Sequence, residues 1–290
     1  MKLEKIYKKQ GYVIIQNALD IEEVNKLRNH LKKKINFSKN KNLINISECI
    51  KDVKIYNLLA EQKIANLSKI IFGENYYVNE LEVQYNSFPS KKNSAYHYDA
   101  QSERENQYLK NEDYKFAKWG IYLQKNTNKY GGGLSVLPGS HKFLPVFKTR
   151  SEKYIKYLMG KLAVRINTNP GDAILFDSRL LHTGTSHQCN NKQDFNEFIK
   201  DNEKIVIYWN VTNKKYSDKY LKNNLNRCFK DEMTKKIDLP YFSESLKLYF
   251  PDDYNENIKK FLVENSINFS SLDKEKSDFL KIVNSSFDLL

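Results

Sequence analysis

Short apolar or aromatic runs alternate with clusters of turn-forming residues through the middle of the chain. The runs cover residues 76–85, 117–123, 134–137, 162–166, 173–176 and 205–211. Turn sequences such as NTNKYGGG and NTNPGD lie between them. Many short strands separated by turns within one stretch are typical of β-sandwiches and barrels. We therefore expect a mainly β fold whose core covers about residues 76–211.

Helical spacing replaces this alternation nearer the N-terminus. After a short strand at residues 13–15, apolar side chains recur at a spacing that predicts an amphipathic helix; they are Ile21, Val24, Leu27, Leu31 and Ile35. Asp20 and Glu23 form a capping box that marks the start of this helix. A second helix is expected over residues 53–71, ending at Gly73.

The C-terminal part of the chain differs in composition from the β core. Beyond residue 216 it is rich in Lys, Asn, Asp and Ser, with helical spacing at 220–233 and 258–263. This pattern predicts helices that pack over the core rather than a second enzyme. We therefore expect a domain at 1–215, with flanking N-terminal helices, and a helical C-terminal extension at 216–290.

The composition agrees with a folded protein that has a sizeable core. Hydrophobic residues make up 40% of the 290 residues and aromatic residues 13%, which argues against a disordered or fibrous chain. The three cysteines, Cys49, Cys189 and Cys228, have no metal-like spacing and predict free thiols in a reducing compartment. No apolar run approaches the roughly 18 residues of a membrane-spanning helix. The expected location is the cytoplasm.

The formal net charge of +13 raises the question of a nucleic-acid partner. Only six of the 48 basic residues are Arg, and the basic residues are spread from Lys2 to Lys281 instead of forming one stripe. This distribution argues against nucleic-acid binding. The alternative is a basic rim around an anionic small-molecule substrate.

Candidate metal ligands lie in two segments far apart in the chain. In AYHYDAQ, His97 and Asp99 are two residues apart, so on a strand both side chains would face the same side. His182 follows the strand at 173–176 in PGDAILFDSRLLHTGTSH. Two histidines and one carboxylate form the facial triad of non-haem Fe(II) oxygenases, which leaves three coordination positions open. Unrelated core or loop histidines, or a zinc hydrolase with the same ligand types, are the alternatives.

The other histidines are better explained without a metal. His30 lies among solvated Lys and Asn residues on the first helix, and His187 lies in a polar loop. His141, in PGSHK, follows a turn and is expected to have a structural role near the rim of the site.

Four segments together resemble a known family. In order they are GYVIIQNALDIEEVNKLR, HYD, KWGIYLQKNTNKYGGGLSVLPGSHK and PGDAILFDSRLLHTGTS, and they span residues 11 to about 211. The sequence resembles the phytanoyl-CoA dioxygenase (PhyH-like) family of Fe(II)/2-oxoglutarate-dependent oxygenases. The resemblance implies a double-stranded β-helix (jelly-roll, cupin-like) core, with His97, Asp99 and His182 as iron ligands.

The resemblance also implies a reaction. Fe(II), 2-oxoglutarate and O2 would be used to hydroxylate a small-molecule metabolite, with succinate and CO2 as co-products. Desaturation or epimerisation on the same scaffold, or a non-catalytic metal-binding jelly-roll protein, are the alternatives.

A cation is needed at the distal carboxylate of 2-oxoglutarate. In the family this is normally an Arg on the strand after the second iron histidine, and here Lys204 occupies the matching position. Lysine offers a point charge in place of the planar guanidinium fork. Arg179 and Arg165 are the other candidates for this contact.

Further contacts to the co-substrate are expected from neighbouring positions. Thr183 lies near the position where the family places a hydroxyl, Trp119 matches an aromatic residue that lines the site, and Gln84 and Tyr98 are polar candidates. The long segment 185–203, with the tail beyond residue 216, is expected to cover the mouth of the barrel when substrate binds.

Overall fold

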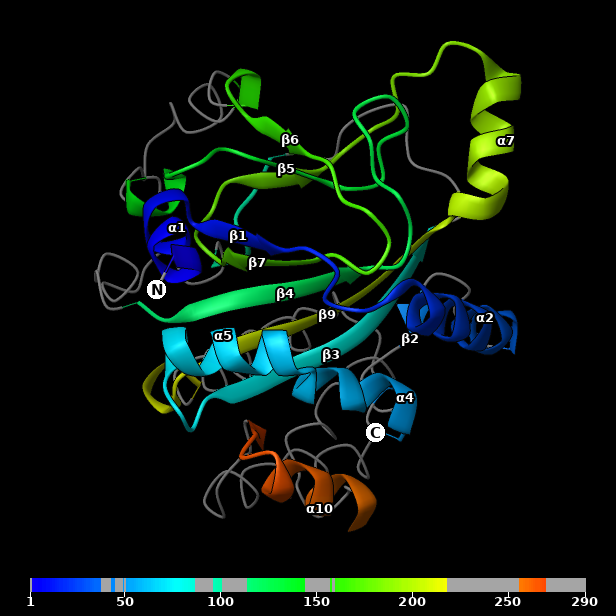
Figure 1. Ribbon diagram of the computed structural model, residues 1–290. Coiled ribbons are helices and arrows are strands. Elements are labelled where there is room, and N and C mark those ends of the chain that lie inside the picture. The colour runs from blue at the N-terminus through cyan, green and yellow to red at the C-terminus, as the bar shows by residue number, and fades with distance from the viewer. Residues whose placement is uncertain are drawn as a thin grey trace, which may run out of the picture.

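Two mainly antiparallel sheets form the centre of the protein in a computed structural model (Figure 1). The structure describes residues 2–37, 43–44, 49, 51–86, 96–100, 114–143, 157, 160–217 and 256–269. The larger, seven-stranded sheet has the order β1 (Tyr12–Ile15), β7 (Ala173–Asp177), β4 (Phe116–Tyr122), β9 (Lys204–Thr212), β3 (Tyr77–Asn86) and β10 (Asn268–Phe269), with β2 (Leu43–Ile44) paired to β3. The smaller sheet has the order β6 (Val164–Ile166), β5 (Leu134–Val136), β8 (His182–Gly184). Strands β10 and β3 are parallel, and the other pairs are antiparallel.

The two faces of the larger sheet pack against different partners. Side chains such as Ile174, Val206 and Tyr208 pack against Leu134 and Val136 of the smaller sheet. Their neighbours along the strands point the other way and pack against helices. Each strand of the larger sheet therefore has an inner face, toward the smaller sheet, and a helix face.

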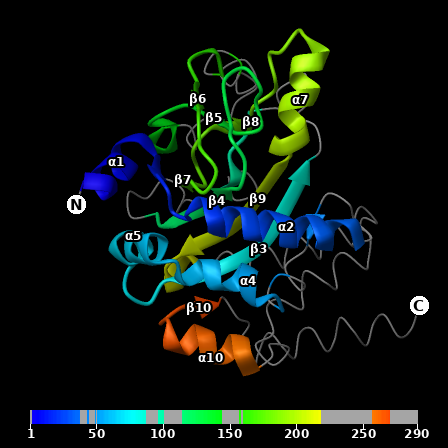
Figure 2. The same ribbon diagram turned by 45° about the vertical axis from the view of Figure 1, so that its right-hand side comes forward.

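The helices lie mainly on one side of the larger sheet, as Figures 1 and 2 show. Their bounds are α1 (Lys2–Gln10), α2 (Ile21–Phe37), α4 (Val53–Tyr56), the 3-10 helix η1 (Asn57–Ala60), α5 (Gln62–Phe72), the 3-10 helix η4 (Ser140–Lys142), α7 (Lys192–Asn202) and α10 (Glu256–Glu264). Helices α2, α4 and α5 supply the apolar side chains that cover the helix face. Helix α7 stands next to the start of β9.

The predicted strands are confirmed, with bounds that differ by one or two residues. The capping box of α2 is also confirmed, since the Glu23 amide donates to Asp20 Oδ1 at 2.8 Å and the Asp20 amide donates to Glu23 Oε2 at 3.3 Å. The expected single helix at 53–71 is wrong, because Glu61 interrupts it and its carboxylate caps α5 by accepting from the Ile64 amide. Helices α1 and α7 were not predicted.

The described part of the C-terminal extension packs on the core. Ile258 and Leu262 of α10 are buried in the same cluster as the helix face of the sheet, and the Phe261 ring lies 5.0 Å from the Tyr56 ring. Strand β10 then adds to the sheet edge beside β3. The predicted helix at 220–233 lies outside the described residues. No helix in the described ranges is long and apolar enough to cross a membrane.

The turn before β7 fixes the N-terminal segment to the sheet. Gly171 has a φ of +89°, and its carbonyl accepts from the Leu19 amide. Asp172 Oδ1 accepts from the Asn17 amide at 2.9 Å. A Cβ at Gly171 would collide with the Leu19 carbonyl and come within 3.0 Å of Val24 Cγ2.

We expect Gly171→Ala to lower the free energy of unfolding by about 2 to 4 kcal/mol, because backbone strain adds to a clash with backbone atoms that cannot rotate away. Gly139→Ala is the matched control. Gly139 has a φ of +81°, but the nearest atom to its Cβ would be 3.8 Å away, so only the strain of roughly 1 to 2 kcal/mol should remain. Urea denaturation of both variants measures the difference, and equal losses would contradict the packing argument.

Candidate metal centre

His97, Asp99 and His182 meet at one end of the space between the sheets. Their candidate ligand atoms all lie within 4.8 Å of one another. Asp99 Oδ1 is 3.5 Å from His182 Nε2 and 3.8 Å from His97 Nε2. The two imidazole rings are 4.4 Å apart at their centroids. This donor set fits a divalent transition metal held by two imidazoles and one carboxylate.

Backbone pairing brings the two histidine segments together. The His97 amide donates to the His182 carbonyl at 2.9 Å, and the His182 amide donates to the His97 carbonyl at 2.8 Å. The Ala100 amide donates to the Ser178 carbonyl, which ties the end of the HxD segment to the loop after β7. Asp99 begins a short 3-10 turn rather than continuing a strand. His182 follows the strand at 173–176 as predicted, and it opens a separate strand, β8, of the smaller sheet.

The surroundings of His182 favour a neutral ring with a free lone pair on Nε2. Its Nδ1 lies 2.9 Å from the Leu180 carbonyl oxygen, which can only accept, so Nδ1 carries the proton. Burial lowers the pKa of His182, although Asp99 opposes the shift. The ring also packs against Phe176, with centroids 4.9 Å apart.

Lys118, which the sequence did not single out, lies beside the triad and contacts Asp99. Its Nζ lies 3.1 Å from Asp99 Oδ2, the carboxylate oxygen that does not face the histidines. Burial alone would raise the pKa of Asp99, but Lys118 and then the two histidines outweigh it and lower the pKa to about 2. The signal in the sequence was a lysine within a strand whose other residues are buried.

Two acidic residues of β3, Glu80 and Glu82, also interact electrostatically with Lys118. A bulge between Asn79 and Glu82 places Glu80 in the left-handed region, with a φ of +53°. Glu80 Oε2 accepts from Asn210 Nδ2 at 2.8 Å. Burial would lower the pKa of Lys118, but Asp99, Glu80 and Glu82 together raise it. Asp99, Glu80 and Glu82 therefore favour the charged form of Lys118, which lies between the candidate ligand Asp99 and this acidic pair.

Lys204 lies on the inner face at the start of β9. It alternates with Ile205, which packs on the helix face, and it shares its side of the strand with Val206 and Tyr208. Burial lowers the pKa of Lys204 to about 8. No carboxylate within the described ranges pairs with it. The Lys204 side chain is partly buried, so its ammonium is partly removed from water, and an anionic ligand would relieve this cost.

The two arginines weighed against Lys204 are bound to protein groups. Arg179 forms a bidentate pair with Asp177, at 2.9 Å from Nε and 2.8 Å from a terminal nitrogen, and lies over the Tyr114 ring. Arg165 donates to the carbonyls of Asn128 and Ser186. Both guanidinium groups are therefore already occupied by protein acceptors.

The remaining predicted contacts divide between the two faces. Gln84 lies opposite Val206 on the inner face and donates to Glu82 Oε1 at 2.8 Å. Trp119 lies on the helix face, where its Nε1 donates to Ser68 Oγ at 3.0 Å, so the structure places it in the core and not beside the triad. Thr183 lies opposite Ser135, on the other side of β8 from His182.

Three further side chains, Tyr98, His141 and His187, contact other protein groups. Tyr98 is buried in a cluster with Leu181 and other apolar residues. His141 Nε2 lies 3.3 Å from the Lys8 carbonyl oxygen, and His187 stacks on a phenylalanine of α7 with centroids 4.1 Å apart. Neither histidine joins the triad.

Comparison with solved structures finds the same fold in metal-dependent proteins. The iron-bound structure of EctD from S. alaskensis has 15% identity and a TM-score of 0.56, over 73% of this chain and 76% of that one. SnoN, a non-haem alpha-ketoglutarate-dependent epimerase from nogalamycin biosynthesis, has 15% identity and a TM-score of 0.54, over 73% and 81%. A nickel complex of the non-haem monooxygenase ThoJ has 13% identity and a TM-score of 0.53, over 72% and 76%.

Sequence comparison gives a more direct assignment. A search of the curated proteins found no match. The family model for phytanoyl-CoA dioxygenase (PhyH), however, matches residues 7–191, which include all three residues of the triad and most of the β core. The chain belongs to the phytanoyl-CoA dioxygenase (PhyH) family.

Proposed function

We propose that the protein is an Fe(II)- and 2-oxoglutarate-dependent dioxygenase that oxidises a small-molecule metabolite. The convergence of two imidazoles and one carboxylate, within 4.8 Å of one another, is the observation that carries this proposal. Membership of the PhyH family supports it. The iron in EctD, and the Fe3+ and alpha-ketoglutarate in the SnoN complex, are ligands of proteins with the same fold.

The proposed iron ligands are His97, Asp99 and His182. When bound, the iron and 2-oxoglutarate supply the oxidative chemistry that consumes O2 and releases succinate and CO2. Three protein ligands leave three positions for co-substrate and O2, provided that Asp99 binds through one oxygen. Lys118 favours binding through one oxygen, because its ammonium lies 3.1 Å from the second oxygen, Asp99 Oδ2, and would keep that oxygen from the metal.

Lys204 is the proposed partner of the distal carboxylate of 2-oxoglutarate. Its position on the inner face and its unpaired ammonium within the described residues support this role. Between Lys204 and Lys118, the inner face carries Tyr122 and Tyr208, whose hydroxyls are hydrogen bonded at 3.0 Å.

Hydroxylation is the proposed outcome, with desaturation or epimerisation as the alternative on the same scaffold. The structural neighbours include an epimerase and a monooxygenase, which supports keeping both the proposed hydroxylation and its alternative. The two-sheet arrangement supports a double-stranded β-helix core at about 76–211 within a domain at 1–215. Residues 216–290 are the proposed extension packed on it, and 185–203 the proposed cover of the mouth.

The three ligand variants His97→Ala, Asp99→Ala and His182→Ala should each weaken Fe(II) binding by about 100-fold or more, because each removes one of three protein ligands. His187→Ala is the control, since His187 stacks on α7 away from the triad. Anaerobic calorimetry with Fe(II), alongside thermal unfolding, measures the effect. Unchanged affinity in any folded ligand variant would contradict the assignment.

Lys118→Met should retain Fe(II) binding but weaken 2-oxoglutarate binding about tenfold. The variant removes a positive charge and no ligand, and it frees the second Asp99 oxygen to occupy a coordination position that the co-substrate needs. Titration of the Fe(II)-loaded protein with 2-oxoglutarate under anaerobic conditions tests this. Equal co-substrate affinity in the variant and the parent would show that Lys118 does not control the carboxylate.

Binding of 2-oxoglutarate should weaken as pH rises through about 8, where Lys204 loses its proton. The carboxylate binds the protonated form, so affinity is full below this pKa and falls above it. Lys204→Arg should stay charged and remove this pH dependence. Lys204→Met should bind 2-oxoglutarate roughly tenfold to hundredfold more weakly, while Fe(II) affinity persists. Affinities measured at saturating Fe(II) across this pH range decide the point, and a parallel decline in Lys204→Arg would exclude Lys204 as its cause.

A further inference from the structure

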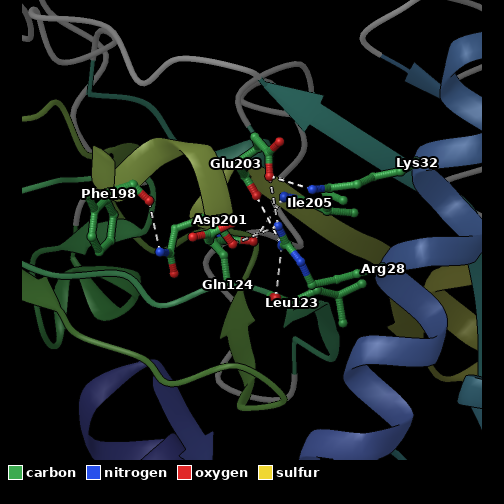
Figure 3. A network of polar contacts seen from close by, with 9 residues as sticks. Arg28, Lys32, Leu123, Gln124, Phe198, Asp201, Glu203 and Ile205 are labelled. Carbon is green, nitrogen blue, oxygen red and sulfur yellow. Dashed lines mark hydrogen bonds and ion pairs between the residues drawn. The ribbon is translucent and has the colours of Figure 1, made fainter. Parts of the chain in front are cut away.

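Arg28 of α2 extends into the junction where α7 leads into β9 (Figure 3). It is only 8% exposed. One terminal nitrogen donates to the carbonyls of Leu123 and Glu203, at 3.0 and 3.1 Å. The other donates to the Asp201 carbonyl at 3.2 Å and to Glu203 Oε2 at 3.0 Å. One guanidinium thus joins α2, the end of β4 and the residues just before β9.

Two further contacts complete this network. Lys32 Nζ, one turn along α2, lies 2.8 Å from the same Glu203 oxygen. The Ile205 amide donates to Gln124 Oε1 at 2.9 Å. The backbone is therefore held on both sides of Lys204, at the Glu203 carbonyl before it and at the Ile205 amide after it.

The chemistry of Arg28 suits this junction better than a lysine would. Burial lowers the pKa of Arg28, and Glu203 opposes the shift. The planar fork offers five donors in fixed directions, so it can bind several carbonyls and a carboxylate at once, which a single ammonium cannot do in the same geometry. The cost of the buried charge is offset only while these contacts are intact.

We propose that Arg28 is a positioning residue for Lys204 and so for the co-substrate. This inference depends on the proposed function, because it takes Lys204 as the carboxylate partner. Lys204 pairs with Asn86 of β3 at the end of the ladder, and the Arg28 contacts add a second tie, from α2 and Leu123 to the Glu203 carbonyl just before it. Lysine has a flexible stem, and its ammonium meets a carboxylate at a set distance from the metal only if its Cα is held.

The test compares Arg28→Lys and Glu203→Gln with Lys26→Met in the full-length, Fe(II)-loaded protein under anaerobic conditions. Lys26 is the control, because it lies on the same helix and pairs with Glu22 at an exposed site. Arg28→Lys should weaken 2-oxoglutarate binding about tenfold and Glu203→Gln about threefold. Fe(II) affinity should not change, and Lys26→Met should match the parent. Hydrogen exchange at the Ile205 amide should be faster in Arg28→Lys and in Glu203→Gln than in the parent. It should not change in Lys26→Met.

A double-mutant cycle separates positioning from general stabilisation. In a Lys204→Met background, Arg28→Lys should change 2-oxoglutarate affinity less than about twofold, while its effect on thermal unfolding remains. A tenfold loss that persists without Lys204 would overturn the positioning role, as would unchanged affinity in folded Arg28→Lys. If Arg28→Lys does not fold, Glu203→Gln carries the same comparison.

Failure of the proposed function gives a different result. In that case the Fe(II)-loaded parent would not bind 2-oxoglutarate, and the role of Arg28 would fall with it. If the parent binds 2-oxoglutarate and neither Arg28→Lys nor Glu203→Gln changes the affinity, only the Arg28 inference is overturned.

Discussion

The pair of backbone hydrogen bonds between His97 and His182 is the contact on which the site depends. It joins the segment that carries two of the candidate ligands, His97 and Asp99, to the strand of the smaller sheet that carries the third, His182. Because each backbone donates to the other, the side chains of the two residues lie directly opposite each other, and their rings converge on Asp99. The candidate metal site is thus built at the edge of the smaller sheet, where backbone pairing holds the His97 segment beside β8.

Charge balance is the second constraint on this interior. Asp99 is held ionised by Lys118, and Lys118 is held charged by Asp99 together with Glu80 and Glu82. Three carboxylates thus share one ammonium, and burial together with Glu80 and Asp99 raises the pKa of Glu82, so the cluster carries excess negative charge that a divalent cation would offset. The bulge of β3 that turns Glu80 inward is therefore part of the electrostatic design of the site.

Near Lys204, at the other end of the inner face, no carboxylate of the described residues balances the positive charge. Lys204 has no carboxylate partner in the described part of the chain, and burial depresses its pKa. The nearby guanidinium of Arg28 is fully engaged with Glu203 and three carbonyls, so it holds the backbone and does not neutralise a ligand. The two ends of the inner face thus differ in kind: carboxylates outnumber the Lys118 ammonium near the triad, whereas Lys204 faces no carboxylate among the described residues.

The sequence by itself predicted seven of the strands and the first long helix, and it singled out the three residues His97, Asp99 and His182 that the fold brings together. Period-two runs and capping residues are local signals, and the motifs around His97 and His182 are long enough to assign their roles by resemblance. It did not determine which face of a strand points inward, because alternation defines two faces but not their partners. Only the tertiary structure placed Lys118 beside Asp99, turned Trp119 toward the helices and paired Arg179 with Asp177. Each of these outcomes depends on packing between strands and helices that local periodicity does not encode.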